Sequence, residues 1–202
     1  MTPATFPAVG PLDQAREHLR RYLQAFPAEA ASLRHLSEQL DIDTGSIFAR
    51  HNMRGHITTS ALVYQARTDA LLMIHHQVLG RWLQPGGHHE GQDELVASAA
   101  REVAEETGVT DLSAWRWLGG QDLPLDIETH AIPANPAKAE GDHAHHDFIY
   151  LFSVENCGEI RPQWTEVRDA RWMPRAEFTQ LPEARFARLG RKLSALLAVH
   201  SG

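Results

Sequence analysis

The sequence predicts an α/β protein in which a β-sheet core follows a helical extension. Residues 12–24 and a segment around 28–40 carry apolar residues at helical spacing, on either side of a Pro-containing break. From residue 56 the chain becomes β-branched and apolar, which is typical of strands. A helical pattern returns over about 93–107 and again over 185–200. Strands interleaved with helices indicate the α/β class.

The strand pattern starts at HITTSALVYQ, residues 56–65, and LLMIHHQ, residues 71–77, follows as the second arm of a hairpin. RWLQPGG, residues 81–87, predicts a short strand that ends in a Pro-Gly-Gly break. Gly108 then closes the helix over 93–107 as a C-terminal stop. The later segments expected to be strands are AWRWLGG (114–120), LDIETHAI (125–132), DFIYLFSVEN (147–156) and DARWMP (169–174).

Length and composition predict one main domain. A chain of 202 residues with 43% apolar residues can bury one sizeable core. We expect an N-terminal helical extension over residues 1–48 and the main domain over 49–202. Amphipathic helices rarely stand alone, so the extension is expected to pack on that core, with a homodimer contact or a substrate lid as alternative uses.

The charge balance argues against a polymer-binding role. The formal net charge is −7, and no dense Lys/Arg block occurs, which disfavours nucleic acid and membrane surfaces as partners. No stretch reaches the roughly 18 apolar residues that span a bilayer. Cys157 is the only cysteine, and the first residues lack the charge and hydropathy pattern of a signal peptide, so a cytoplasmic location is expected.

Three glutamates crowd one side of the helix over 93–107. At about 100° per residue, Glu102, Glu105 and Glu106 fall within one sector beside an apolar face, and Arg101 is the only basic residue in this run. Like charges at this spacing repel, so a cation should compensate them. Carboxylate oxygens suit Mg²⁺ or Mn²⁺, which take their remaining ligands from water and substrate phosphates. The alternative is a solvated acidic helix face.

GHHEGQDELVASAAREVAEETGV, residues 87–109, resembles the Nudix box. That pattern is Gly, five residues, Glu, seven residues, Arg-Glu, an aliphatic residue, any residue, Glu-Glu, any residue, Gly and an aliphatic residue. Its one departure here is Asp93, which stands where the pattern has Glu and keeps the charge with a shorter reach. The matching positions are Gly87, Arg101, Glu102, Val103, Glu105, Glu106, Gly108 and Val109.

The resemblance to the Nudix hydrolase family implies a fold and a chemistry. The implied fold is a Nudix-type α/β/α sandwich on a mixed β-sheet. The implied activity is Mg²⁺- or Mn²⁺-dependent hydrolysis of a pyrophosphate linkage, in a nucleoside diphosphate linked to some group X or in a nucleoside triphosphate, by water attack at phosphorus. A small-molecule nucleotide is therefore the expected substrate.

The resemblance also implies roles for individual residues. Glu102, Glu105 and Glu106 would hold the metal, together with the Gly86 carbonyl, and Glu102, Glu105 and Arg101 would be catalytic. Glu102 is a candidate general base, although family members take the base from different places, including loops outside the box. The residues that would brace the box are Gly87, Asp93 and Gly108, with an expected contact from Asp93 to Arg101.

Histidines gather in THAIPANPAKAEGDHAHHDF, residues 129–148, which Pro and Gly residues mark as a long loop between strands. One interpretation is a substrate-binding wall over the box helix, and a second is a separate soft-metal site, since imidazole suits Zn²⁺. The third is an exposed polar loop. The candidate substrate contacts are His143, His145, His146 and Lys138, and Asp147 is a candidate extra metal ligand.

Two further functions remain open from the sequence. A nucleotide sensor without turnover could use the same scaffold, because fold does not fix function. An RNA 5′-end pyrophosphohydrolase would share the chemistry, but it needs a basic track for the polymer, which the charge of −7 does not provide.

Overall fold

The structure is a computed structural model that describes residues 10–90, 94–117, 122–136, 139–156 and 158–200. Two helices precede the sheet: α1 (Pro11–Ala25) and α2 (Arg34–Ile42), with short 3₁₀ turns at η1 (Pro27–Glu29) and η2 (Ser46–Phe48). The later helices are α3 (Leu95–Thr107), α4 (Arg175–Phe178) and α5 (Ala184–His200). Among the described helices, none is both long and apolar enough to cross a membrane.

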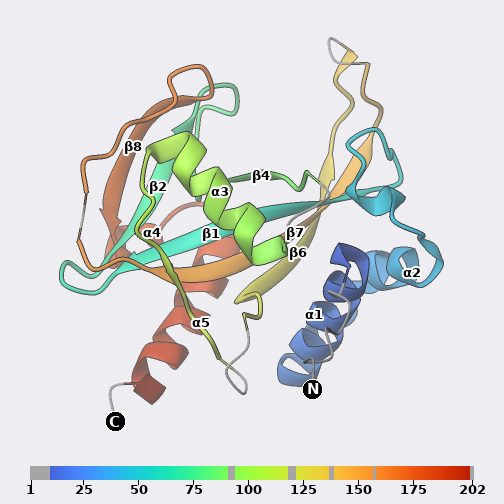
Figure 1. The fold of residues 1–202 in the computed structure, drawn as a ribbon, viewed down its shortest axis with the longest axis horizontal. Helices are drawn as coiled ribbons and strands as arrows, with labels where there is room; N and C mark the ends of the chain where they lie inside the picture. Colours follow the sequence, from blue (N-terminus) through green and yellow to red (C-terminus); the bar gives the residue numbers. More distant parts are fainter. Residues whose placement is uncertain (1–9, 91–93, 118–121, 137–138, 157, 201–202) are drawn as a thin grey trace, which may run out of the picture.

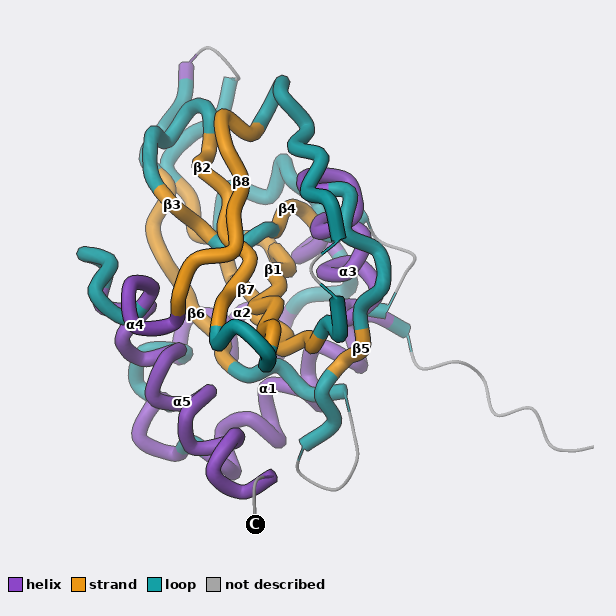
Figure 2. The backbone as a smooth tube through the Cα atoms, turned by 90° about the vertical axis from the view of Figure 1, so that its left-hand side faces the viewer, coloured by secondary structure: helices purple, strands orange, loops and turns teal. Residues whose placement is uncertain are grey.

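One mixed sheet forms the centre of the molecule (Figures 1 and 2). Its strands are β1 (His56–Gln65), β2 (Ala70–His76), β3 (Trp82–Leu83), β4 (Gly86–His88), β5 (Ser113–Ala114), β6 (Asp126–Ile132), β7 (His143–Ser153) and β8 (Val167–Pro174). The path β3-β2-β1-β7-β5 is extended by β4 on β1, β6 on β7 and β8 on β2. The β1–β7 pair is parallel and the other pairs are antiparallel.

The central strands are buried on both faces, which explains their almost uninterrupted apolar sequence. Alternate side chains of β1 enter different cores: Ala61 and Val63 join the core that includes α3, whereas Leu62 and Tyr64 join the core that includes α5. Helices therefore cover both faces of the sheet, and the α/β/α sandwich expected from the sequence is confirmed (Figure 2).

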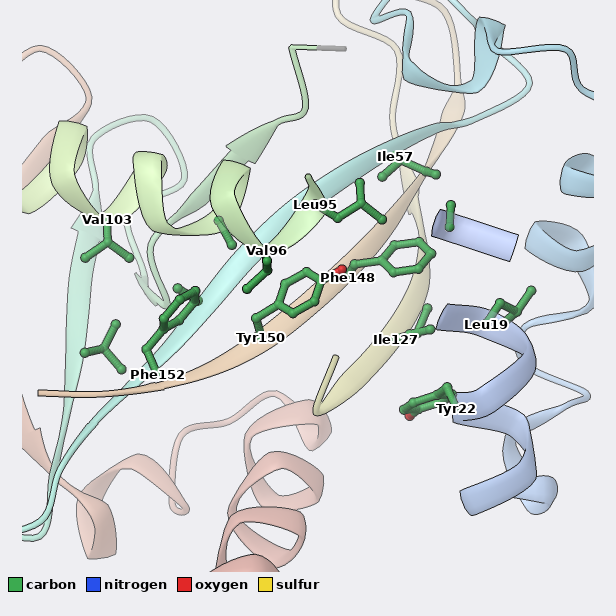
Figure 3. Packing of buried hydrophobic residues seen from close by; sticks show 14 of the residues in the cluster. Leu19, Tyr22, Ile57, Leu95, Val96, Val103, Ile127, Phe148, Tyr150 and Phe152 are labelled. Atoms are coloured by element: carbon green, nitrogen blue, oxygen red, sulfur yellow. The ribbon is translucent and has the colours of Figure 1, made fainter. Parts of the chain in front are cut away.

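The N-terminal helices pack against the α3 side of this sheet. Tyr22 of α1 extends toward Ile127 of the sheet (Figure 3), and Leu19 belongs to the same core as Phe148 and as Val103 of α3. The expectation that the helical extension packs on the main core is thus met at the level of side-chain contacts.

A buried polar group ties α1 to α5 through the first residue of β6. Asp126 is fully buried, and Lys192 Nζ lies 2.5 Å from its Oδ1 while Arg188 lies 2.7 Å from its Oδ2. The hydroxyl of Tyr22 donates to Asp126 at 2.9 Å, and Lys192 also pairs with Glu29 at 2.9 Å. Arg188 and Lys192 of α5 therefore compensate the negative charge of Asp126, while Tyr22 of α1 donates a hydrogen bond to it.

Most segments predicted from the sequence are confirmed, with three corrections. The segment 114–120 is not a strand over its described part, because only Ser113–Ala114 pairs with β7 and the Trp117 indole donates instead to the carbonyl of Leu123. The segment 81–87 is divided between β3 and β4, which pair with different neighbours, β2 and β1.

The third correction concerns the histidine-rich segment. His143, His145 and His146 were expected in a loop before the strand predicted over 147–156, but they belong to β7, which starts at His143 and pairs with the whole of β6. The long antiparallel register from Asp126–Ile149 to Ile132–His143 extends the strand through these polar residues, since cross-strand pairing outweighs their low strand propensity.

Candidate metal and phosphate site

Helix α3 sets two carboxylates against the glycines of β4. Glu106 Oε2 accepts a hydrogen bond from the Gly86 N–H at 3.0 Å. The carboxylate of Glu102, one turn earlier, lies over Gly87, where an added Cβ would stand 2.6 Å from Oε2. The two side chains are four residues apart, so the helix presents them on one face. The sequence folds this way because Val96, Ala99 and Val103 bury the adjacent face of α3 in the core.

Burial perturbs both carboxylates. Glu106 is 5% exposed, and this burial raises the pKa of its carboxyl to about 8, although the Gly86 N–H opposes the rise. Burial also raises the pKa of Glu102 to about 6, against the opposing effect of Arg101. The like charge of Glu105 also raises the pKa of Glu102, and Glu102 and Glu105 raise that of Glu106.

Arg101 forms ion pairs with Glu102 and Glu105. Its guanidinium lies 2.9 Å from Glu102 and 2.8 Å from Glu105, and it also donates to the carbonyl of His88 at 3.3 Å. Glu105 has a side chain that is 55% exposed, so it lies at the outer edge of the site, whereas Glu102 and Glu106 lie inside. The structure therefore brings two of the three predicted ligands together and places the third beside Arg101.

Gly86, Gly87 and Gly108 each occupy a position that requires glycine, for a different structural reason in each case. Gly87 leaves room for the Glu102 carboxylate. Gly86 lies so close to β1 that an added Cβ would meet Ser60 Oγ at 2.4 Å and the Thr59 carbonyl oxygen at 2.7 Å. Gly108 ends α3 with φ +73°, a left-handed conformation that glycine adopts at helix ends without strain.

Two residues of the predicted site lie outside the described residues. Asp93, with its expected contact to Arg101, is one of them, and Lys138 is the other.

The predicted histidines do not approach these carboxylates. Successive side chains of β7 point to opposite faces of the sheet, so His146 faces away from His143 and His145. His146 lies on the side of α2, where it is fully buried and hydrogen-bonded to Thr129 and Gln39. His143 and His145 lie an even number of residues before Ile149 on β7, so all three side chains point to the same face of the sheet. The side chain of Ile149 joins the core on the α5 side. They therefore lie on the face of the sheet opposite α3.

Asp147 is also turned to that face and is already satisfied. Its carboxylate accepts hydrogen bonds from Ser60 at 2.7 and 2.8 Å and from Thr58 at 3.1 Å. Burial raises the pKa of Asp147, and the two hydroxyl donors oppose the rise. The sequence could not indicate these partners, because the parallel register of β1 and β7 brings them together from far apart in the chain.

The residues at the α3–β4 contact fit a hard divalent cation. All candidate side-chain donors are carboxylate oxygens, the preferred ligands of Mg²⁺ and Mn²⁺. Burial raises the pKa values of Glu102 and Glu106, and neighbouring carboxylates raise them further. A bound cation would relieve that repulsion and lower both values.

Two curated proteins are similar to this chain in sequence. A probable DHNTP pyrophosphohydrolase of Lactococcus lactis subsp. cremoris is 32% identical over 113 residues, which cover 53% of this chain and 63% of the relative. The CMP-5′-(N-acetyl-N-hydroxy-3-aminopropyl)phosphonate hydrolase of Streptomyces rubellomurinus is 26% identical over 70% of this chain and 63% of its own length. The chain thus spans less than two thirds of the length of these two relatives.

Solved structures support the same fold. An Ap4A hydrolase of C. elegans in a binary complex superposes with a TM-score of 0.55 at 20% identity, over 70% of this chain and 97% of that one. The E. coli dihydroneopterin triphosphate pyrophosphohydrolase superposes with a TM-score of 0.53 at 14% identity, over 67% and 92% of the two chains. The NUDIX domain profile matches residues 54–196, from just before β1 into α5. With that match over most of its length, the chain belongs to the NUDIX domain family.

Proposed function

We propose that this protein is a Mg²⁺- or Mn²⁺-dependent hydrolase of a phosphoanhydride linkage in a small nucleotide, either a nucleoside diphosphate linked to X or a nucleoside triphosphate. The observation that carries the proposal is the placement of the Glu102 and Glu106 carboxylates against the Gly86–Gly87 backbone. The curated relative named a probable DHNTP pyrophosphohydrolase supports this class of reaction. We also propose a cytoplasmic location, because Cys157 is the only cysteine of the sequence.

The proposed metal ligands are Glu102, Glu105 and Glu106, with the Gly86 carbonyl. The chemistry that a bound Mg²⁺ or Mn²⁺ supplies is neutralisation of phosphoryl charge and activation of water as a nucleophile. The chain would thereby bind a polyanion despite its charge of −7, because the cation reverses the local sign of charge.

The protein side chains hold this arrangement in place. The Gly86 N–H orients Glu106 by donating to Oε2, and this hydrogen bond stabilises the ionised carboxylate that a metal requires. Arg101 bridges Glu102, Glu105 and the carbonyl of His88, so it couples the orientation of α3 to β4. We propose that Arg101 keeps Glu102 in position when substrate phosphates approach.

The experiment is phosphate or pyrophosphate release from a panel of nucleoside triphosphates, dinucleoside polyphosphates, nucleotide sugars, ADP-ribose and dinucleotide cofactors, with Mg²⁺, Mn²⁺ or EDTA. We expect metal-dependent turnover of one group, which EDTA abolishes. Glu106→Gln is the test variant, and Glu38→Gln is the control, because Glu38 lies exposed on α2, where it pairs only with Arg34 among the ion pairs of the described residues.

Three outcomes would contradict the proposal. Tight nucleotide binding without turnover would indicate a sensor. If 5′-triphosphorylated RNA is added to the panel, turnover of the RNA without turnover of any small nucleotide would indicate an RNA-end enzyme. Equal turnover by the wild type and the Glu106→Gln variant would exclude the carboxylate site as the centre of the reaction.

A further inference from the structure

A second group of potential ligands lies on the opposite face of the sheet from α3. His88 of β4, His56 of β1 and His145 of β7 belong to neighbouring strands, and His143 lies two residues before His145 on the same face. His56 is the centre of the group, because its ring centroid lies 4.6 Å from that of His145 and 5.0 Å from those of His88 and His143. We call these four residues the imidazole cluster.

Two of the distances between ring nitrogens are close to those between the ligands of a bound metal ion. The Nε2 atoms of His56 and His88 are 3.1 Å apart, and those of His143 and His145 are 3.3 Å apart. Zn–N bonds of about 2.0–2.1 Å in a tetrahedron place neighbouring nitrogens about 3.3 Å apart, whereas square-planar ligation places them about 2.9 Å apart. Ligand atoms of His56, His143 and His145 all lie within 4.8 Å of one another, and His88 adjoins this group through its contact with His56.

Backbone carbonyls select the tautomer that a metal needs. Nδ1 of His143 lies 2.8 Å from the Gly141 carbonyl oxygen, and Nδ1 of His56 lies 3.4 Å from that of Asn52. A proton on Nδ1 that is donated to a carbonyl leaves the lone pair on Nε2, the atom that faces the cluster. This carbonyl–imidazole arrangement is the usual outer shell of histidine ligands.

Burial disfavours the charged form of two rings of the imidazole cluster. Burial lowers the pKa of His56, with His143 adding to the effect. Burial lowers the pKa of His145 to about 2, and the neighbouring histidines lower it further than burial alone.

We propose that His56, His88, His143 and His145 bind one Zn²⁺ ion in a structural site that is separate from the carboxylate site. An all-imidazole set with no carboxylate suits Zn²⁺ rather than Mg²⁺ or Mn²⁺. The ion would link β1, β4 and β7, whose residues are far apart in the sequence.

This site also supports the carboxylate site without belonging to it. His88 follows Gly86 and Gly87 directly, so an ion on His88 restrains the strand that contacts Glu106 and Glu102. The proposal does not depend on the proposed function, because zinc binding at the cluster requires no turnover.

The test uses the full chain, freed of metal by a chelator and titrated with Zn²⁺ alone against a chromophoric competitor. We expect about one ion per chain and a rise in melting temperature of roughly 5–10 °C at a hundredfold excess over Kd. Titration with Co²⁺ should give the intense visible absorption of a tetrahedral site. The double variant His143→Gln/His145→Gln should lose at least about a hundredfold in zinc affinity, and His88→Gln is a second variant in case the double variant does not fold.

Two matched controls separate the alternatives. His51→Gln changes an exposed histidine and should bind zinc as the wild type does. Glu106→Gln should keep zinc affinity while it loses Mn²⁺ affinity. The proposal is overturned if the wild type binds no zinc, or if zinc binding disappears in Glu106→Gln and persists in the histidine variants.

Discussion

Replacement of Gly87 by Ala should mainly lower activity, whereas replacement of Gly86, the adjacent glycine of β4, should mainly lower stability. In Gly87→Ala the new Cβ would lie 2.6 Å from Glu102 Oε2, while ordinary contact begins at 3.4 Å, so the carboxylate must move by about 0.8 Å (3.4 − 2.6). The obstacle is the end of a flexible side chain, so the free energy of unfolding should change by less than about 1 kcal/mol. A displacement near 1 Å at a reacting centre costs up to about a hundredfold in rate, and we expect a loss of about 10- to 100-fold in kcat.

Gly86→Ala meets backbone instead of a flexible side chain. Its Cβ would lie 2.4 Å from Ser60 Oγ, 2.7 Å from the Thr59 carbonyl oxygen and 2.8 Å from Ser60 Cα. Strand β1 cannot yield easily, because it is also paired with β7. The overpacking should cost about 2–3 kcal/mol, which lowers the melting temperature of a chain of this size by roughly 4–12 °C.

The assay compares thermal unfolding, Mn²⁺ binding by electron paramagnetic resonance, and hydrolysis of the nucleotide that the panel identifies. Gly158→Ala is the control, because nothing lies within 4 Å of its added Cβ. Wild-type Mn²⁺ affinity and turnover in Gly87→Ala would refute the argument that the position of the Glu102 carboxylate matters. A wild-type melting temperature for Gly86→Ala would refute the close approach of β4 to β1.

Three further predictions concern charge. Glu106→Gln should lower hydrolysis by at least about a hundredfold with the fold intact by circular dichroism, as loss of transition-state charge stabilisation does. Asp126→Asn should lower the free energy of unfolding by about 3 kcal/mol in chemical denaturation, because Lys192 loses a buried partner; an unchanged value would contradict this. Burial lowers the pKa of His18 from 6.5 to about 4, so the folded state binds the proton less well than the unfolded state does. The contribution of His18 to the free energy of unfolding should be fully present above pH 6.5 and should fall by up to about 3 kcal/mol toward pH 4. His18→Gln, which can still bond the Tyr150 hydroxyl, should lose that pH dependence.

Secondary structure was predictable where one local pattern decides it. Residues 56–65 form β1 with the expected bounds, and the acidic helix ends at Gly108 as expected. The prediction was wrong where long-range pairing overrides local preference. The polar residues from His143 onward read as a loop, yet β6 draws them into a strand by a continuous antiparallel register.

The sequence by itself determined the box helix, its three glutamates and the family resemblance, because fixed spacing along one helix places side chains without reference to the rest of the chain. Only the tertiary structure decided that Glu102 and Glu106 face β4 while Glu105 lies outside, since this depends on how α3 rotates against the sheet. It alone brought His56 and His88 to His143 and His145. Parallel pairing of β1 with β7 joins residues nearly ninety positions apart, and the register of such pairs is set by the burial of whole strands rather than by any local signal.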